Sequence, residues 1–249
     1  TGYGQTGDYK DKAGHDINYL ALSGIAGHSG RQQSGPPPLG IQVADIAGGS
    51  LHAVIGILTA VIERAQSGQG QYIDISMTDC VVALNSMAAA AALAGNITPQ
   101  PESGILNGAS FYDYYETQDG RYLSIGSLEP QFMSGLATLL ELPLLLEKGA
   151  SLHAEDRLAV RQAIQQKIKT RSLDAWQQLF SAQDVCVEPV LQLNEALHSD
   201  LAQQRHWVVQ VPLQEQSTET QAQLACPIKF SRSVMRYDFM GQALGAGSW

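Results

Sequence analysis

The stretch from Ile46 to Gln66 constrains the fold most strongly, because apolar residues occur on almost every face of the helix that it predicts. The apolar positions are Ile46, Leu51, Val54, Ile55, Ile57, Leu58, Val61 and Ile62. Asp45 stands where a helix N-cap is expected, and the segment ends in the glycine-rich stop Ser67-Gly-Gln-Gly70. A helix that is apolar on most faces is normally buried, so we expect this one inside a substantial core.

Shorter patterns around this segment predict a mixture of helices and strands. Gln71 to Ile75 alternates as a short strand would, and Thr78 to Ala94 is typical of an alanine-rich helix. Phe111 to Tyr115 and Tyr122 to Ile125 flank an Asp-Gly turn, which is a strong signal for a β-hairpin. Further helices are expected at Gln131 to Leu142, Asp156 to Lys169, Ser172 onward and Leu193 to Arg205. A strand is expected at Val185 to Leu191, β structure after Trp207, and a frayed tail from Gly241 to Gly247. This order fits the α/β or α+β class.

Composition narrows the classes of function. The 15 Lys and Arg residues against 24 Asp and Glu give a net charge of −9, and no basic patch stands out, which argues against nucleic-acid binding. The chain opens without a basic and apolar leader, and the longest apolar stretch, Ser50 to Ile62, is expected to be too short to span a membrane. We therefore expect a cytoplasmic protein. The first residue is Thr1 rather than Met, so the sequence can be a piece of a longer protein.

The spacing of potential ligands does not indicate a metal site. Cys80, Cys186 and Cys226 lie far apart without a CxxC pair, and the six histidines form neither an HxH nor an HExxH arrangement. We expect the cysteines to be reduced, buried thiols and the protein to hold no metal.

His15 lies in the dense polar string Gly14-His-Asp-Ile-Asn-Tyr19, between a glycine-rich loop and an apolar segment. An ionisable pair beside a backbone bared by glycine is a common way to build a site. A histidine whose hydrogen bonds are satisfied within the fold would give the same pattern, so both interpretations stay open at this point.

Asp45 also has two interpretations. As an N-cap, its carboxylate would stabilise the helix by about 1 kcal/mol. The same helix end offers free N–H groups and a positive dipole, which can stabilise negative charge on a substrate. Gly48 and Gly49 follow closely and would let either a ligand or another helix approach the backbone.

Glu129 follows the predicted hairpin, in the string Ser127-Leu-Glu-Pro-Gln-Phe132. An acid at the start of a helix is favoured by the helix dipole, and Pro130 stiffens the turn. Taken alone, this position indicates a structural role.

Taken together, these three strings resemble the α-methylacyl-CoA racemases, which belong to the family III CoA-transferases. The matching strings are Gly14-His-Asp-Ile-Asn-Tyr-Leu-Ala-Leu-Ser-Gly24, Ala44-Asp-Ile-Ala-Gly-Gly-Ser50 and Leu128-Glu-Pro-Gln-Phe132, with support from Thr1-Gly-Tyr-Gly-Gln-Thr-Gly7, Gly68-Gln-Gly-Gln-Tyr-Ile-Asp74, Phe111-Tyr112 and Asp184-Val-Cys-Val-Glu-Pro-Val190. They occur in order from residue 1 to about residue 210, which makes the resemblance specific.

The resemblance implies an α/β, family III CoA-transferase-like fold in which this chain lacks most of the N-terminal CoA-binding α/β region. It implies buried helices, a small mixed-sheet domain and a helical lobe. We accordingly divide the chain into residues 1–95 (linker, catalytic loop and long helices of the large domain), residues 96–195 (small α/β domain with hairpin and helical lobe) and residues 196–249 (C-terminal return segment). The resemblance also implies an interlocked homodimer with its active site between domains.

The resemblance further implies what the site residues do. His15 and Asp45 are expected to act as the two acid/base groups on opposite sides of the substrate Cα, with Glu129 paired with His15. Substrate binding is assigned to Gly14, Asp16, Tyr19, Gly48 and Gly49. The activity implied is racemisation of 2-methylacyl-CoA thioesters by 1,1-proton transfer through an enolate.

Two alternatives stay open. Family III CoA-transferases look similar around Asp45, where the aspartate carries a covalent acyl intermediate, but they lack the His15 and Glu129 strings. A non-catalytic fragment that dimerises is the second alternative.

Inversion by proton transfer needs one group on each face of the carbon, one to remove the proton and one to return it. The enolate oxygen needs hydrogen-bond donors, and we expect these to be backbone N–H groups at the start of the helix after Asp45. No cofactor is expected beyond the CoA of the substrate. Ser29 to Leu39 and Met77 to Met87 are candidate walls of the acyl pocket, although core packing suits the second segment better.

Overall fold

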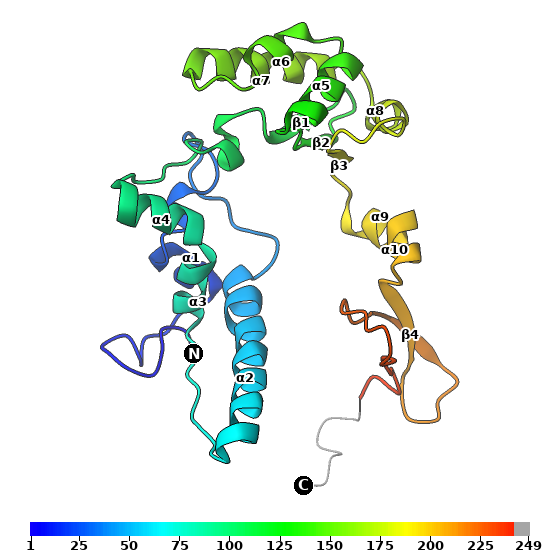
Figure 1. Cartoon of the computed structure of the whole chain (residues 1–249). Coiled ribbons are helices and arrows are strands. Elements are labelled where there is room, and N and C mark those ends of the chain that lie inside the picture. Colours follow the sequence, from blue (N-terminus) through cyan, green and yellow to red (C-terminus); the bar gives the residue numbers. More distant parts are fainter. Residues whose placement is uncertain (242–249) are drawn as a thin grey trace. The chain divides into compact units, whose positions relative to one another are not determined.

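The computed structural model describes residues 1–241. The chain divides into two compact units, Thr1–Pro189 and Val190–Trp249, and each is described separately (Figure 1). The first unit contains two hydrophobic cores, one among the N-terminal helices and one around a three-stranded sheet.

The N-terminal helices of the first unit form a small core. They are α1 (Asp16–Leu22), the 3-10 turn η1 (Ala26–His28), the π-helix η2 (Ala44–Leu51), α2 (His52–Ser67), α3 (Met77–Leu84), α4 (Ser86–Gly95) and a second π-helical turn, η3 (Ile105–Ala109). Buried Tyr19 and Leu20 of α1 pack there with Ala44 of η2 and Val81 of α3. The segment that carries His15 and the segment that carries Asp45 therefore share one core.

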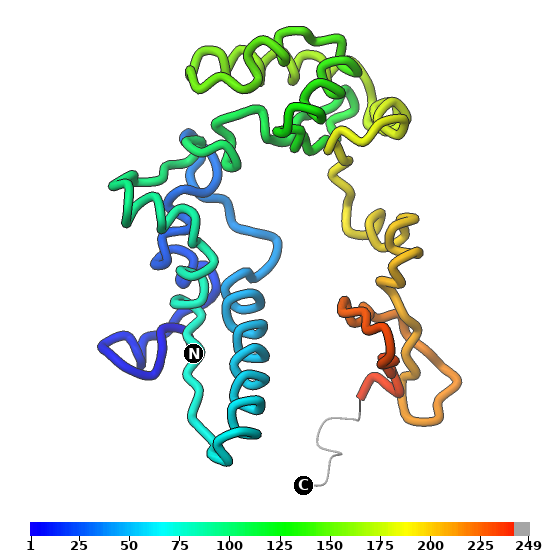
Figure 2. Tube along the Cα trace, in the orientation of Figure 1, coloured from blue at the N-terminus to red at the C-terminus, as the bar shows by residue number. Residues whose placement is uncertain are grey.

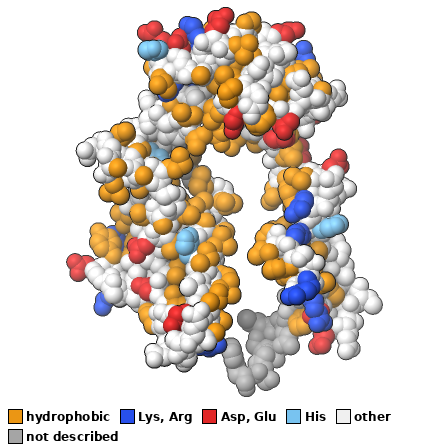
Figure 3. Space-filling view, in the orientation of Figure 1, with side chains coloured by type: hydrophobic (Ala, Val, Ile, Leu, Met, Phe, Trp, Pro, Cys, Tyr) orange, Lys and Arg blue, Asp and Glu red, His pale blue; other side chains and the backbone are white. Residues whose placement is uncertain are grey.

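Helix α2 is the longest helix of this region, and its apolar side chains are exposed. Leu58 and Ile62, for example, are 57% and 64% exposed, and no residue of α2 is buried. Hydrophobic side chains follow the length of α2 in Figure 3. The prediction of a buried helix is therefore wrong for this chain, because periodicity reports that a surface is apolar but not which molecule covers it.

The helical run Ala44–Ser67 also changes one expectation about membranes. It is 24 residues long, and by length and composition alone it is apolar enough to cross a membrane. The expectation that the apolar stretch is too short is wrong, since the helix extends well beyond Ser50 to Ile62. Met77–Leu84 and Ser86–Gly95 would form a second such segment only across a bend of 74°.

Residues 71–76 lead from α2 into α3 without joining a sheet. The predicted strand Gln71 to Ile75 is absent, and this extended segment instead holds the first residues of the chain (Figure 2). The Thr1 amino group donates to the Ile75 carbonyl at 2.9 Å, and the Met77 amide donates to the Thr1 carbonyl at 2.9 Å. The predicted helix from Thr78 to Ala94 is likewise divided, since Asn85 ends α3 and begins α4.

The second core of the first unit surrounds an antiparallel sheet of order β1-β2-β3. Its strands are β1 (Asp113–Glu116), β2 (Tyr122–Ile125) and β3 (Val187–Pro189). The predicted hairpin is confirmed, with Asp113 opposite Ile125 and Glu116 opposite Tyr122. The small domain was expected to hold a mixed sheet, but every strand pair among the described residues is antiparallel.

Four helices close this core. They are α5 (Pro130–Leu139), α6 (Pro143–Lys148), α7 (Ala154–Ile168) and α8 (Leu173–Phe180). Ser172 caps α8 as predicted, by accepting a hydrogen bond from the Ala175 amide. Trp176 is fully buried, and its indole N–H donates to the Ile168 carbonyl at 2.8 Å. Burial and a satisfied polar group make Trp176 the largest anchor of this core.

The second unit is small and has little buried apolar surface of its own. It contains α9 (Leu193–His198), α10 (Asp200–Gln204) and the hairpin of β4 (Val208–Pro212) and β5 (Thr220–Leu224). The single predicted helix from Leu193 to Arg205 is two helices, because Ser199 is extended and caps α10. Residues 242–247 of the predicted tail lie outside the described residues.

Candidate functional site

His15 is the N-cap of α1 and lies on the surface. Its backbone N–H donates to Asn18 Oδ1 at 3.0 Å, and its carbonyl accepts from the Asn18 amide at 2.8 Å. The imidazole makes no hydrogen bond or ion pair with any residue between 1 and 241. The interpretation of His15 as a histidine satisfied within the fold is therefore not supported, and its ring is accessible.

Asp45 is the second residue of η2 and not its N-cap. Val43 occupies the cap position, and the side chain of Asp45 makes no capping hydrogen bond. The capping group comes from another helix, because Asp16 Oδ1 accepts from the amides of Ala44 and Asp45 at 2.6 and 3.1 Å. The interpretation of Asp45 as only a cap is therefore wrong, and its half-exposed carboxylate is left for another role.

The amides at the start of η2 already have acceptors. Those of Ala44 and Asp45 are bound by Asp16, and that of Ile46 donates to the Gln42 carbonyl at 3.0 Å. The prediction that free N–H groups just after Asp45 hold an enolate oxygen is therefore wrong for this first turn.

Gly14 and Tyr19 support the loop that carries His15. Tyr19 is buried, its hydroxyl donates to the Gly14 carbonyl at 2.6 Å, and its ring meets that of Tyr3 edge-on. A Cβ on Gly14 would lie 2.6 Å from the Tyr3 hydroxyl, so a larger residue there would force the Tyr3 and Tyr19 side chains to shift. Burial raises the pKa of Tyr19, and the charges of Tyr3 and Asp45 raise it further, so Asp45 is electrostatically coupled to this phenol. These contacts fix the backbone on both sides of His15.

Gly48 and Gly49 allow α3 to pack closely on η2. A Cβ on Gly48 would lie 3.0 Å from Val81 Cγ2, and one on Gly49 would lie 3.0 Å from Met77 Cγ. The sequence left open whether these glycines admit a ligand or another helix. In the structure another helix, α3, approaches them. In the segment Met77 to Met87, Met77 packs on the core as expected, whereas Met87 is exposed and does not. Substrate binding by the two glycines stays a prediction.

Glu129 is held at the start of α5 by contacts behind the hairpin. The Gly126 amide donates to the Cys186 carbonyl at 2.9 Å, and the buried Ser127 hydroxyl donates to the Val185 carbonyl. Glu129 itself is exposed and is the N-cap residue of α5. Within residues 1–241 no hydrogen bond or ion pair joins Glu129 to His15, so their pairing also stays a prediction.

A cavity of about 600 Å³ lies between the loop after η1 and the sheet. The loop contributes residues between His28 and Pro37, and the opposite side includes Tyr112, Ile125 and Cys186. The role of Ser29 to Leu39 as a wall of the acyl pocket stays a prediction. Burial, with the charges of Asp184, Glu129 and Glu188, raises the pKa of the Cys186 thiol. The cavity thus borders the segment that leads to Glu129.

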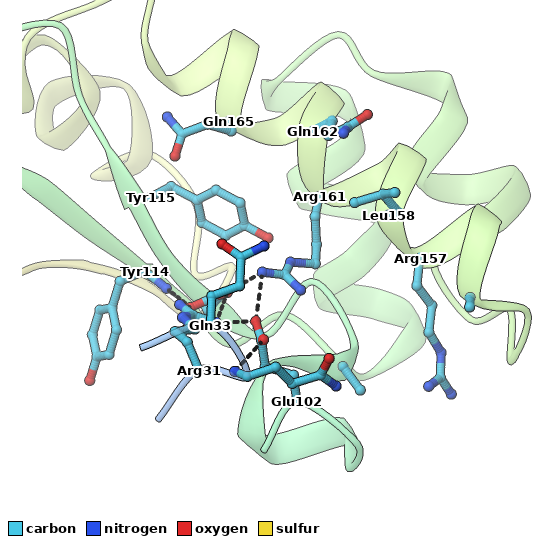
Figure 4. A pocket seen from close by; sticks show the side chains of 14 residues that line it. Arg31, Gln33, Glu102, Tyr114, Tyr115, Arg157, Leu158, Arg161, Gln162 and Gln165 are labelled. Carbon is cyan, nitrogen blue, oxygen red and sulfur yellow. Dashed lines mark hydrogen bonds and ion pairs between the residues drawn. The ribbon is translucent and has the colours of Figure 1, made fainter. Parts of the chain in front are cut away.

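A second cavity, of about 650 Å³, contains an ion-pair network that sequence reasoning missed. Arg31 donates to Asp113 Oδ2 at 2.9 Å and to Glu102 at 3.3 Å, and Arg161 approaches the same two acids at 3.3 and 3.5 Å (Figure 4). The bond to Asp113 raises the pKa of the Arg31 guanidinium. The network fastens the loop after η1 to β1 and α7. The paired residues lie 48 to 82 positions apart in the sequence, so no local pattern could have found the network.

Comparison with known families decides the relationship. CoA-transferase family III matches residues 1–245. The chain belongs to CoA-transferase family III. The alpha-methylacyl-CoA racemase of Mus musculus is 39% identical over 210 residues, which is 80% of this chain and 52% of the relative.

Other members of the family have different names. The succinyl-CoA:glutarate CoA-transferase of Homo sapiens is 29% identical over 198 residues, or 76% of this chain and 44% of that protein. A crystal structure of a CAIB/BAIF family protein from Brucella suis superposes with a TM-score of 0.77 at 26% identity, covering 98% of this chain and 63% of that one. The family III fold is therefore confirmed, and the chain spans about half the length of these curated relatives.

Proposed function

We propose that the protein containing this chain racemises 2-methylacyl-CoA thioesters at the α-carbon. One observation carries this proposal. Asp16 caps the helix that Asp45 would otherwise cap, which leaves the Asp45 carboxylate free on an element packed against the helix that starts after His15. Two unpaired acid/base groups on neighbouring elements are what a two-base reaction requires.

The proposed reaction is a proton transfer through an enolate. The thioester makes the α-proton acidic, one group removes it from one face, and the other group returns a proton to the opposite face. For one enantiomer neutral His15 is the base and protonated Asp45 the acid, and for the other ionised Asp45 is the base and charged His15 the acid. Glu129 would pair with His15 and favour its charged form.

No cofactor is proposed beyond the CoA of the substrate, since proton transfer needs no redox or Lewis-acid group. Among residues 1–241 no three His, Cys, Asp or Glu side chains gather as metal ligands. The proposed location is the cytoplasm.

We also propose that protein, and not lipid, covers the exposed side of α2 in the complete enzyme. The helix continues from η2, which packs on α3 in the small core, and its last turns include the charged residues Glu63 and Arg64. An interlocked homodimer would bury this surface. Light scattering of the full-length protein would give twice the monomer mass if the homodimer forms, and a monomer would contradict the homodimer.

The experiment for the activity uses the full-length protein with an enantiomerically pure 2-methylacyl-CoA in deuterium oxide. Racemisation should proceed with one deuterium gained at the α-carbon. Asp45→Ala should slow this reaction by about 10²–10⁴-fold, the usual worth of a positioned acid or base. Asp8→Ala, an exposed acid elsewhere on the N-terminal segment, is the matched control and should change nothing.

The relatives named as CoA-transferases suggest the alternative activity, which the same experiment can detect. A transferase would form a covalent acyl adduct on Asp45 when mixed with an acyl-CoA, and mass spectrometry would detect it. An adduct on Asp45 together with no α-deuteration would overturn the racemase proposal.

A further inference from the structure

Asp16 connects the two segments that carry the proposed acid/base groups. It directly follows His15 as the first residue of α1, and its Oδ1 accepts hydrogen bonds from the backbone N–H groups of Ala44 and Asp45 at 2.6 and 3.1 Å. The bonds span 28 and 29 residues of sequence. One half-buried carboxylate thus bridges the start of α1 and the start of η2.

The chemistry of this contact makes it strong and directional. The first amides of a helix have no carbonyl partner on that helix, and they lie at the positive end of its dipole. A carboxylate that accepts from them forms charge-assisted hydrogen bonds, which are shorter and stronger than neutral ones. Aspartate has a short side chain, so little rotamer freedom remains once two bonds are made.

The bonds reach the backbone of Asp45 and leave its carboxylate untouched. They can therefore fix where the Asp45 side chain starts without occupying the group that would exchange a proton. On the other side of the bridge, the Tyr19 hydroxyl fixes Gly14, the residue before His15, at 2.6 Å. Both reacting segments are anchored through α1.

We propose that Asp16 is a positioning residue that sets the separation of His15 and Asp45. The inference rests on the proposed function, because it assigns Asp16 a role within the two-base reaction. The Asp16 Oδ1 is committed to the two amides, and substrate binding by Asp16 stays a prediction.

The test compares Asp16→Ala with Asp16→Asn in the full-length protein. Asparagine keeps an Oδ1 that can accept both hydrogen bonds, whereas alanine removes the acceptor. Asp16→Ala should lower kcat for α-deuteration by about 100-fold with KM nearly unchanged, as expected when reacting groups move by about 1 Å. Asp16→Asn should recover most of the rate. Asp11→Ala, an exposed acid on the same segment, is the control and should behave as the wild type.

A second measurement tests the hydrogen bonds from Ala44 and Asp45 to Asp16 without relying on catalytic turnover. Amide hydrogen exchange at Ala44 and Asp45 should accelerate at least about tenfold in Asp16→Ala and much less in Asp16→Asn, because a protecting hydrogen bond is lost only in the first. This measurement keeps its meaning if the wild type does not racemise any substrate, an outcome that would remove the proposed function but not the bridge.

Three results would overturn the inference. The first is unchanged amide exchange in a folded Asp16→Ala protein. The second is a large rise in KM with unchanged kcat, which would make Asp16 a substrate-binding residue. The third is an asparagine variant as impaired as the alanine variant, which would mean that the negative charge matters and the hydrogen-bond acceptor does not.

Discussion

The helical lobe (residues 111–187) and the N-terminal helices (residues 16–95) differ in how they bury apolar surface. Within the described chain, the core of the helical lobe contains sixteen buried apolar residues, whereas that of the N-terminal helices contains four. Yet the N-terminal helices include a long helix, α2, whose large apolar side chains are exposed. The two regions therefore differ in how far the described chain covers its own apolar side chains.

This difference separates two sources of stability. The helical lobe is stabilised by contacts within itself, so its free energy of unfolding should respond to core substitutions in this chain. The N-terminal helices are joined by hydrogen bonds and a small core, and the surface of α2 is available to another molecule. The largest effect on stability should therefore come from the helical lobe and the smallest from α2.

Trp176→Ala should have the largest effect. The indole is fully buried and its N–H donates to the Ile168 carbonyl, so alanine leaves a cavity and removes this hydrogen bond. We expect the free energy of unfolding to fall by about 3–5 kcal/mol. Urea denaturation followed by circular dichroism measures this change. Gln178→Ala, on the exposed side of the same helix, should stay within about 0.5 kcal/mol. A Trp176→Ala protein as stable as the wild type would mean that the lobe is not held by its core.

Glu102→Gln should have an intermediate effect that depends on pH. The pKa of Glu102 is lowered by the hydrogen bond from the Gln32 amide and also by the charges of Arg31 and Arg161. A carboxyl whose pKa is lower in the folded state stabilises the fold above its ordinary pKa, and this contribution is lost as the pH falls through the folded value. At pH 7 the substitution should therefore lower the free energy of unfolding by about 1 kcal/mol.

Thermal unfolding of wild type and Glu102→Gln between pH 7 and pH 3 measures this dependence. The difference between the two proteins should shrink as the pH falls, because protonation removes the same charge in the wild type. A difference that stays constant over this range would show that the network does not depend on the ionised carboxylate.

Ile55→Ser and Ile62→Ser should have the smallest effect on this chain. Both side chains are more than half exposed, so each change should alter the free energy of unfolding by less than about 0.5 kcal/mol. The same changes should reduce self-association in sedimentation, because they remove apolar surface from α2. Leu136→Ser is the contrasting variant, since Leu136 is fully buried in the helical lobe and a buried hydroxyl there should destabilise it strongly. Equal destabilisation by all three changes would contradict the comparison.

Local signals were predicted well from the sequence. The hairpin around Asp119 and Gly120 and the cap at Ser172 are specified by a few neighbouring residues, and both are present. Long-range contacts could not be predicted in this way. The bonds from Asp16 to η2 and from Arg31 to Asp113 join residues far apart in sequence, and nothing in their surroundings identifies the partner. Asp45 illustrates the consequence, since a good local cap residue lost that role to an acid 29 residues earlier.

The π-helical form of η2 controls the direction in which Asp45 faces. Each turn of a π-helix contains about one more residue than a turn of an α-helix. The Ser50 hydroxyl donates to the Asp45 carbonyl at 3.1 Å, and His52 Nδ1 lies 2.7 Å from the Ala47 carbonyl oxygen. Successive residues of an α-helix are rotated by about 100° around the axis. Tightening η2 by one residue would therefore turn Asp45 by roughly that angle relative to α2. The direction of the Asp45 side chain should therefore be sensitive to a single insertion or deletion between residues 44 and 51.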